Sequence, residues 1–275
     1  MTRWYADWQN PEHVERFDAR SHLDARNLIR NYEAFNDVRL LKEWLDPSRS
    51  VDLLEVGCAT GEFARYVRLR FPRLRYVGLD ISTPAVARAK SKYPQTAFFV
   101  VDAARPLAES LNSLGVPESP AVIYSKDVVP HQVEPLAFLS GLIRQASEAV
   151  IVRCRTRDVG ETERDPERSC QYHYGGWMPY IVLNLQELIG HLLAEASGSE
   201  VIVYRHHMIL GGFNNRFLPK ELYLEETGTA ETAVGLFKRT ARPGQVTIRD
   251  RSDEAFTGTW DYRIKRLTQR VIRTP

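Results

Sequence analysis

The stretch of sequence that decides the fold reads Val51-Asp-Leu-Leu-Glu-Val-Gly-Cys-Ala-Thr-Gly-Glu-Phe63. An apolar run ends in Gly57, a tight turn follows, and Gly61 opens a predicted helix. Nineteen residues after Gly61 (80 − 61), a second apolar run that begins at Tyr76 ends in Asp80. The order strand, glycine turn, helix, strand and terminal acid is typical of the first half of a nucleotide-binding βαβ unit. The stretch therefore predicts an α/β fold with a ligand at the glycine turn.

The residues of the turn favour a ligand without phosphate. A dinucleotide fingerprint needs glycine at three positions, which here are Gly57, Ala59 and Glu62. A carboxylate at the third position would repel a pyrophosphate, and the P-loop pattern G-x-x-x-x-G-K-[ST] does not occur in the sequence. A cationic ligand suits Glu55 and Glu62 better. S-adenosylmethionine combines an adenosine, a sulfonium and an amino acid, and carries no phosphate.

At these residues the chain resembles the class I S-adenosylmethionine-dependent methyltransferases that act on small molecules. Their first motif reads acid-x-Gly-x-Gly-x-Gly, which Glu55, Gly57, Ala59 and Gly61 match with alanine in place of the middle glycine. The resemblance extends over roughly residues 35–240. It implies an enzyme with S-adenosylmethionine as cofactor. It also implies a Rossmann-like, doubly wound, mostly parallel sheet of seven strands, of which the last two form an antiparallel hairpin.

The resemblance gives cofactor roles to residues at the ends of the predicted strands. Asp80 would bind the ribose hydroxyls, and Asp102 would accept a hydrogen bond from the adenine amino group. From the residues alone, Asp80 could instead cap the following helix, Asp102 could form an Asx turn, and Ile81 could belong to the core. The residues expected at the cofactor are Glu55, Gly57, Ala59, Gly61, Asp80, Ile81, Asp102, Ala103 and Ser125.

His131 is the candidate catalytic residue. It follows the fourth predicted strand, Ala121–Tyr124, at a place where the resembled family often has a histidine facing the cofactor. An imidazole with an unperturbed pKa of about 6.5 suits a general base that takes the proton of a methyl acceptor. A structural histidine held in a loop is the alternative.

Two segments are candidates for contact with the acceptor: one at the end of the fifth predicted strand, Ala149–Cys154, and one after it. Alternating arginines at 153, 155 and 157 point to one side, which favours either an anionic acceptor or a solvated strand edge paired with nearby acids. The aromatic stretch 171–180 predicts a lid or wall for a sugar or a flat polar ring, or else a surface loop anchored in the core. The residues expected at the acceptor are Arg155, Tyr172, His173, Tyr174 and Trp177.

The chain has 275 residues and an apolar content of 43%, enough for one large α/β domain. We expect a helical cap over residues 1–45, with one helix from about Ala25 to Leu45 and with Trp4, Tyr5 and Trp8 folded over the site. The methyltransferase domain is expected over residues 46–240, with substrate-facing insertions at 155–183 and 206–230. Residues 241–275 form a basic C-terminal extension.

Composition and charge limit the partners and the location. The net charge is +2, and no apolar run approaches the about 20 residues of a membrane span. The N-terminus lacks the apolar core of a signal peptide, and three scattered cysteines without a CxxC pair favour a reducing cytoplasm. Adjacent His206 and His207 would face opposite sides of a strand, so no metal is expected. A homodimer remains possible.

The expected reaction is in-line methyl transfer to a hydroxyl or amine of a small molecule, such as a glycan, a lipid precursor or a secondary metabolite. An RNA- or DNA-modifying methyltransferase is a second candidate. Ser125-Lys-Asp-Val disfavours it, because base-modifying amino enzymes carry Asn/Asp-Pro-Pro-Tyr/Phe there, although the basic tail keeps it open. A non-catalytic partner subunit and an aminopropyl transferase are further candidates. The aminopropyl transferase would need more acids than Asp127 and Glu134.

Overall fold

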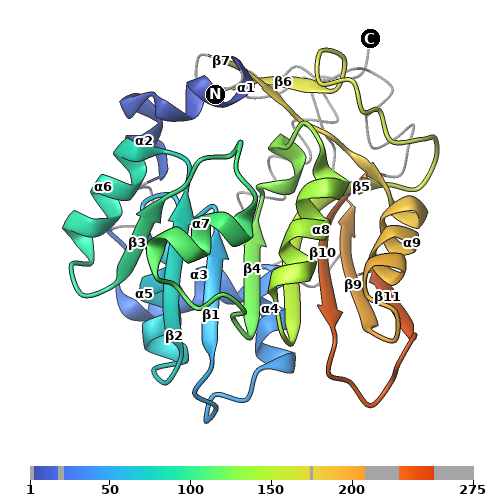
Figure 1. The fold of residues 1–275 in the computed structure, drawn as a ribbon, viewed down its shortest axis with the longest axis horizontal. Helices are drawn as coiled ribbons and strands as arrows, with labels where there is room; N and C mark the ends of the chain where they lie inside the picture. The colour runs from blue at the N-terminus through green and yellow to red at the C-terminus, as the bar shows by residue number, and fades with distance from the viewer. Residues whose placement is uncertain (1–2, 18–21, 174–175, 208–228, 251–275) are drawn as a thin grey trace.

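The computed structural model describes residues 3–17, 22–173, 176–207 and 229–250. Within these residues the chain forms one mixed sheet of nine strands and a separate two-stranded hairpin (Figure 1). The strands of the sheet are β1 (Asp52–Val56), β2 (Arg75–Asp80), β3 (Ala97–Val100), β4 (Val122–Lys126), β5 (Ala149–Arg157), β8 (Leu183–Asn184), β9 (Glu200–His207), β10 (Ala230–Phe237) and β11 (Val246–Asp250). Their order is β11-β9-β10-β5-β4-β1-β2-β3, and β8 pairs with β5.

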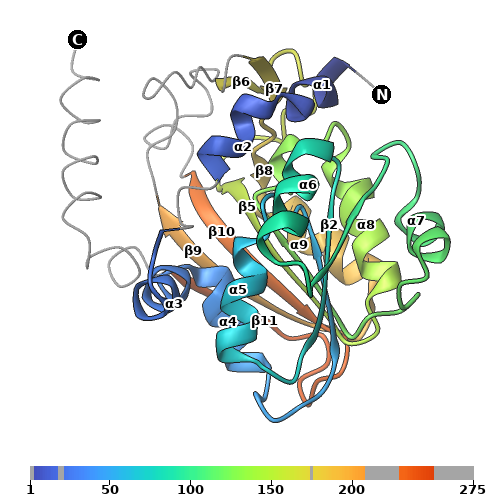
Figure 2. The same cartoon turned by 90° about the vertical axis from the view of Figure 1, so that its left-hand side faces the viewer.

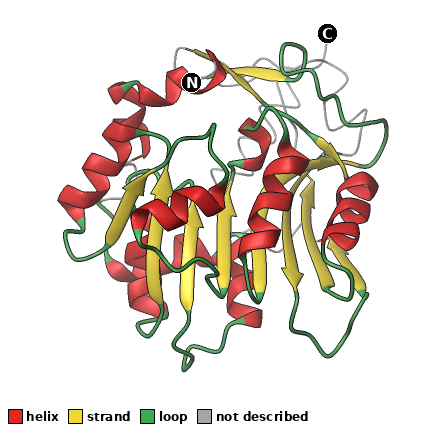
Figure 3. Ribbon diagram, in the orientation of Figure 1, coloured by secondary structure: helices red, strands yellow, loops and turns green. Residues whose placement is uncertain are grey.

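Helices cover both faces of this sheet, as Figures 2 and 3 show. One face carries α3 (Ala25–Glu33), α4 (Asn36–Trp44) and α5 (Glu62–Arg70), and the other carries α7 (Leu107–Leu114), α8 (Pro135–Gln145) and α9 (Leu185–Glu195). The helix α6 (Thr83–Lys92) lies along β2 and β3. Each layer buries its own apolar cluster against the strands, since an amphipathic helix must cover its apolar stripe.

The strand pairing confirms the expected doubly wound, mostly parallel fold. β1 pairs in parallel with β2 and β4, whereas β10 runs antiparallel to both β5 and β9. The seven expected strands are therefore present, with the last two in the antiparallel hairpin. Two further strands were not expected: β8 joins β5, and β11 lies within the part of the chain interpreted as an extension.

A roof of short elements lies over the carboxyl ends of the parallel strands (Figure 1). On one side this roof contains α1 (Arg3–Ala6), the 3-10 helix η1 (Asp7–Gln9) and α2 (Pro11–Phe17), and on the other the hairpin β6 (Cys170–His173) and β7 (Gly176–Pro179). β7 contacts both α1 and η1, so the two halves of the roof lie side by side.

The single helix expected at the N-terminal side of the domain is two helices, α3 and α4. The segment from Ala25 to Leu45 breaks at Phe35, whose backbone is extended (φ −85°, ψ 139°). The ring of Phe35 lies 3.6 Å from the Lys126 ammonium and 4.6 Å from the Arg153 guanidinium. A cation over an aromatic face is attracted by the ring quadrupole, and this contact holds the break where the sequence has neither glycine nor proline.

Candidate active site

The strand order reverses between β1 and β4, and the main cavity of the described residues opens there at the carboxyl ends of the strands. Its volume is about 800 Å³. This value lies within the range of roughly 300–1,000 Å³ typical of small-molecule sites, and the location is the one expected for ligands of open α/β sheets. The expected site residues that line it are Gly57, Ala59, Asp80, Ile81, Asp102, Ala103, His131 and Arg155.

The turn after β1 has a left-handed backbone at three residues: Gly57 (φ 90°), Ala59 (φ 46°) and Gly61 (φ 81°). A Cβ at Gly57 would lie 2.2 Å from a methyl group of Val128, so a side chain is excluded there. The amide of Gly57 donates to the carbonyl of Leu79 at 2.7 Å, which ties the turn to β2. We call this turn, residues 57–61, the glycine shelf; its backbone is fixed, and it forms one end of the cavity.

Asp80 ends β2 and connects this turn to the start of the next helix. Its Oδ2 accepts from the Ala59 amide and its Oδ1 from the Ser82 amide, both at 2.8 Å. Burial raises the pKa of Asp80, and these two backbone hydrogen bonds oppose the rise. The helix cap is Ser82, whose Oγ accepts from the Ala85 amide, so the capping role considered for Asp80 falls to its neighbour.

Residues after β2 and β3 form the adjoining wall. Ile81, Asp102 and Ala103 all line the cavity. Asp102 Oδ1 also accepts from the Ala104 amide at 2.9 Å, which is the Asx turn considered as the alternative for this residue. Asp102 therefore forms a loop turn and faces the cavity at the same time.

The negative charge expected near the turn is largely compensated. Burial raises the pKa of Glu55 to about 8, and its carboxyl accepts a hydrogen bond from the hydroxyl of Tyr76. Glu62 lines the cavity but forms an ion pair with Lys92. Neither carboxyl presents an uncompensated charge at neutral pH, contrary to the expectation from sequence. Asp80 lines the cavity at the same end.

Three of the expected cofactor residues lie behind the lining. Glu55 is 4% exposed and points into the core. Ser125 is fully buried, and its Oγ donates to the Val56 carbonyl at 2.9 Å. Gly61 precedes α5, and a Cβ there would lie 2.7 Å from the ring of Phe98. These residues shape the shelf from below.

His131 lies in the 3-10 helix η3 (Val129–His131), just after β4. Its Nδ1 is 2.8 Å from the carbonyl oxygen of Pro179, and its ring lies between Trp8 (centroids 5.1 Å apart) and Tyr180 (5.7 Å). A carbonyl only accepts, so Nδ1 carries the proton of this hydrogen bond, and Nε2 is the basic nitrogen of the neutral ring. Both halves of the roof thus orient this imidazole at the cavity.

Residues 54–146, which contain the shelf, Asp80 and His131, match a family described as a methyltransferase domain. This part of the chain therefore has the pattern of a methyltransferase domain, which makes the protein an enzyme. A search of curated protein sequences finds no match.

Solved structures similar to this methyltransferase have low sequence identity. The N-terminal domain of EvdMO1, crystallised in the presence of S-adenosylhomocysteine and D-fucose, is 14% identical over 76% of this chain and 83% of that one, with a TM-score of 0.51. An O-methyltransferase from a trans-AT PKS multienzyme of Brevibacillus brevis is 14% identical over 74% and 62%, with a TM-score of 0.46. The magnesium protoporphyrin IX methyltransferase of Synechocystis PCC 6803 is 13% identical over 84% and 94%, with a TM-score of 0.49. The first of these likenesses shows a shared fold.

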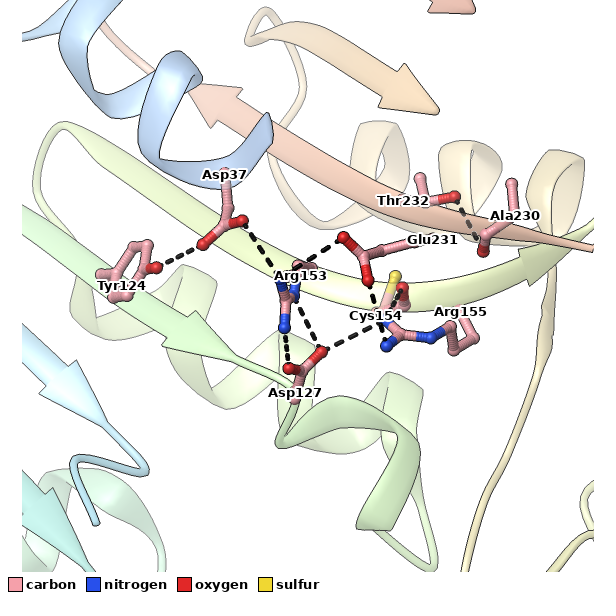
Figure 4. A network of polar contacts seen from close by, with 9 residues as sticks. All are labelled: Asp37, Tyr124, Asp127, Arg153, Cys154, Arg155, Ala230, Glu231 and Thr232. Carbon is pink, nitrogen blue, oxygen red and sulfur yellow. Dashed lines mark hydrogen bonds and ion pairs between the residues drawn. The ribbon is translucent and has the colours of Figure 1, made fainter. Parts of the chain in front are cut away.

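Arg153 and Arg155 of β5 form a buried ionic network with Asp127 and Glu231 (Figure 4). Arg153 Nε donates to Asp127 at 2.9 Å and its Nη1 to Glu231 at 3.3 Å, while Arg155 lies 3.2 Å from Asp127 and 3.3 Å from Glu231. Burial disfavours the charge of Asp127, but the two guanidinium groups outweigh it and hold the pKa of that carboxyl well below its usual range. The expected solvated strand edge is wrong, because Arg153 and Arg155 are only 6% and 7% exposed.

Strand alternation in the hairpin of β6 and β7 places the expected acceptor residues on one face and their sequence neighbours on the other. Tyr172 pairs with Trp177 on the outer face, and Trp177 is 49% exposed and lines a separate shallow pocket with Trp4 and Cys170. Gln171, Met178 and Tyr180 occupy the alternate positions and line the cavity. His173 ends β6, and Tyr174 lies outside the described residues.

Sequence reasoning missed several residues that build the methyltransferase site. Tyr5 and Trp8 line the cavity as the expected cap, but Gln9 was not singled out. Its side chain donates to the Ile81 carbonyl at 2.6 Å and accepts from the Thr83 amide at 3.1 Å. Gln171 and Tyr180 were also missed. The period of two along the hairpin was the signal that could have found them.

Across the described ranges, no group of three or more histidines, cysteines or acids could hold a metal ion. No helix in that part of the chain is both long and apolar enough to cross a membrane.

Proposed function

We propose that this methyltransferase transfers a methyl group to a hydroxyl of a small molecule, with His131 as general base. The observation that carries the proposal is the hydrogen bond between His131 Nδ1 and the Pro179 carbonyl, at a ring that lines the cavity. An acceptor hydroxyl must lose a proton during methylation, whereas a neutral amine needs little help. An oriented imidazole therefore supports a hydroxyl acceptor over an amine.

The residues present fit S-adenosylmethionine. Gly57 keeps the shelf free of side chains, Asp80 offers carboxylate oxygens to a ribose, and Asp102 with Ile81 suits an adenine. When bound, the cofactor supplies a methyl group already activated by its sulfonium. With the cofactor bound, His131 Nε2 would take the proton of the acceptor hydroxyl. The roof orients the reactants and excludes water.

The proposal includes the division of the chain into a helical cap (residues 1–45), a catalytic domain (46–240) and an extension (241–275), of which β11 continues the catalytic sheet by pairing with β9. It gives no role in the reaction to nucleic acid. The nearly balanced charge supports this interpretation, since Lys and Arg number 37 and Asp and Glu 35.

His131→Gln tests the proposed base, because glutamine keeps a polar side chain of similar length but takes no proton at neutral pH. We expect turnover of a hydroxyl acceptor to fall by roughly 10²–10⁴-fold. The dissociation constant of S-adenosylhomocysteine should change less than about threefold, since His131 is not expected to bind the cofactor. The measurement is release of S-adenosylhomocysteine with a panel of sugars, phenols and amines of matched size. Unchanged turnover of a hydroxyl acceptor at neutral pH would show that His131 is not the base.

A further inference from the structure

Three buried polar atoms belong to residues that line the cavity beside His131. They are Arg155 Nε, Gln171 Oε1 and Tyr180 Oη, and none has a hydrogen-bond partner among the described residues. Arg155, Gln171 and Tyr180 are 7%, 2% and 4% exposed, and all three line the cavity. A buried polar group without a partner costs about 1–3 kcal/mol, so three such atoms around one cavity indicate that a ligand completes them.

The backbone holds these side chains together next to the catalytic histidine. Ser169 Oγ donates to the Tyr180 carbonyl at 2.9 Å, and the Tyr180 amide donates to the Ser169 carbonyl at 2.8 Å. Gln171 faces Met178 across the hairpin, on the inner face that Tyr180 continues. The ring of Tyr180 lies 5.7 Å, centroid to centroid, from that of His131. The hairpin and β5 thus bring donors and an acceptor to one place.

The charge around this place is balanced. Arg153 and Arg155 are each within 3.3 Å of a carboxylate oxygen of Glu231, and both contact Asp127. Asp37 also lies 3.9 Å from Arg153, and the Lys126 ammonium acts on Asp127, so three cations face three carboxylates. An anionic ligand would gain little net attraction and would lose its hydration, so this arrangement disfavours the anionic acceptor considered from the sequence.

We propose that Arg155, Gln171 and Tyr180 form the acceptor subsite, and that the acceptor is a neutral ring with at least two hydroxyl groups. This inference rests on the proposed function. One hydroxyl donates to Gln171 Oε1 and accepts from Tyr180 Oη and Arg155 Nε, which places a second hydroxyl of the same ring at His131. Sugars and polyphenols share this chemistry, and the rings of Trp8 and Tyr5 in the lining suit the face of either.

The test compares neutral and anionic rings with isosteric variants. The acceptors are a methyl hexopyranoside and the matching uronate, and a catechol and the matching hydroxybenzoate. In Gln171→Leu and Tyr180→Phe we expect KM for the neutral acceptor to rise about tenfold or more, with kcat changed less than threefold. The matched control is Tyr172→Phe on the outer face of the same hairpin, which should leave KM unchanged. The better neutral substrate, hexopyranoside or catechol, identifies the source of the ring.

Three outcomes would overturn the subsite: an unchanged KM in both variants, preferential methylation of the anionic ring, or no binding of any neutral ring to the enzyme loaded with S-adenosylhomocysteine. Binding is followed by saturation-transfer NMR, so acceptors that bind without turnover are also detected. An enzyme that binds a neutral ring through Gln171 and Tyr180 but methylates only amines would instead overturn the proposed function. An unchanged affinity for S-adenosylhomocysteine in each variant shows that it is folded.

Discussion

Asp80 uses both carboxylate oxygens to hold the shelf and the start of α6 in place, and it also faces the cavity. Asp80→Ala should raise the dissociation constant of S-adenosylhomocysteine more than about tenfold, or ~1.4 kcal/mol, because the ribose loses its acceptor and Ala59 loses its anchor. Asp80→Asn keeps one acceptor oxygen and should lose less affinity. Calorimetric titration measures both constants. A loss below tenfold for the alanine variant would argue against Asp80 as the ribose ligand.

The carboxyl of Glu55 makes the free energy of unfolding depend on pH. Burial raises the pKa of its carboxyl from 4.5 to about 8, against the hydrogen bond from Tyr76. Between these values the folded protein keeps a proton that the unfolded chain releases. The contribution of Glu55 to the free energy of unfolding is therefore complete below about pH 4.5 and is lost as the pH rises to about 8.

Glu55→Gln removes this titration while keeping an oxygen that accepts from Tyr76. The variant should gain stability relative to the natural protein as the pH rises from 5 to 8, by on the order of a few kcal/mol. Urea unfolding of both proteins at pH 5, 6.5 and 8 gives the difference directly. A difference that stays constant over this range would mean that Glu55 is ionised in the folded protein.

At the scale of elements, the side chain of Gln9 links the N-terminal helices to the loop between β2 and α6. Gln9 connects the Ile81 carbonyl with the Thr83 amide, across 72 and 74 residues of sequence. Gln9→Ala should raise the dissociation constant of S-adenosylhomocysteine roughly three- to tenfold. The reason is the loss of two hydrogen bonds that hold the loop from Ile81 to Thr83, which is expected to contact the adenosine. Stopped-flow measurement should place the change in the dissociation rate.

The neighbouring Asn10 provides the control for this experiment. Its Oδ1 accepts from the Glu12 amide, so this hydrogen bond is local to the N-terminal segment. Asn10→Ala shortens a similar amide side chain and should leave the dissociation rate unchanged. Equal effects of Gln9→Ala and Asn10→Ala would indicate general loosening of the N-terminal helices instead of a specific link.

The elements also show what the sequence could predict and what it could not. Gly57 and Asp80 have local signals, since a left-handed turn needs glycine and a strand end exposes its side chain, and both line the cavity as expected. The hairpin was harder to predict, because aromatic content drew attention to Tyr172 and Trp177 while strand alternation faces Gln171 inward. The break at Phe35 depends on cations from β4 and β5, which no local pattern reveals.

At the scale of the whole molecule, ligand binding should be coupled to stability. S-adenosylhomocysteine at about 100 times its dissociation constant should add ~2.7 kcal/mol to the free energy of unfolding, which corresponds to roughly 5–10 °C in Tm for a chain of this size. NADH and ATP at the same concentration should give no shift, because the turn lacks both the glycine pattern of a dinucleotide site and the P-loop pattern. Differential scanning fluorimetry measures all three. A comparable shift with NADH or ATP would contradict the cofactor assignment.

The overall topology followed from the order of apolar runs and turns, which a parallel sheet converts almost directly into neighbouring strands. The buried network of Arg153 did not follow, because its partners Asp127 and Glu231 are 26 and 78 residues away and only the sheet brings them together. The strand β11 was missed for a similar reason. Its residues are half-buried or exposed, so their pattern resembles a tail.

The roof also sets an order for turnover. The glycine shelf follows β1 and Asp80 ends β2, whereas the hairpin of β6 and β7, which Tyr180 follows, lies over these strand ends (Figure 1). If the methyl donor binds first, the acceptor covers it. If the acceptor binds first, it obstructs the entry of the methyl donor. Binding should therefore be ordered, with the methyl donor bound before the acceptor and the demethylated donor released last. The demethylated donor should inhibit competitively with respect to the methyl donor and not with respect to the acceptor.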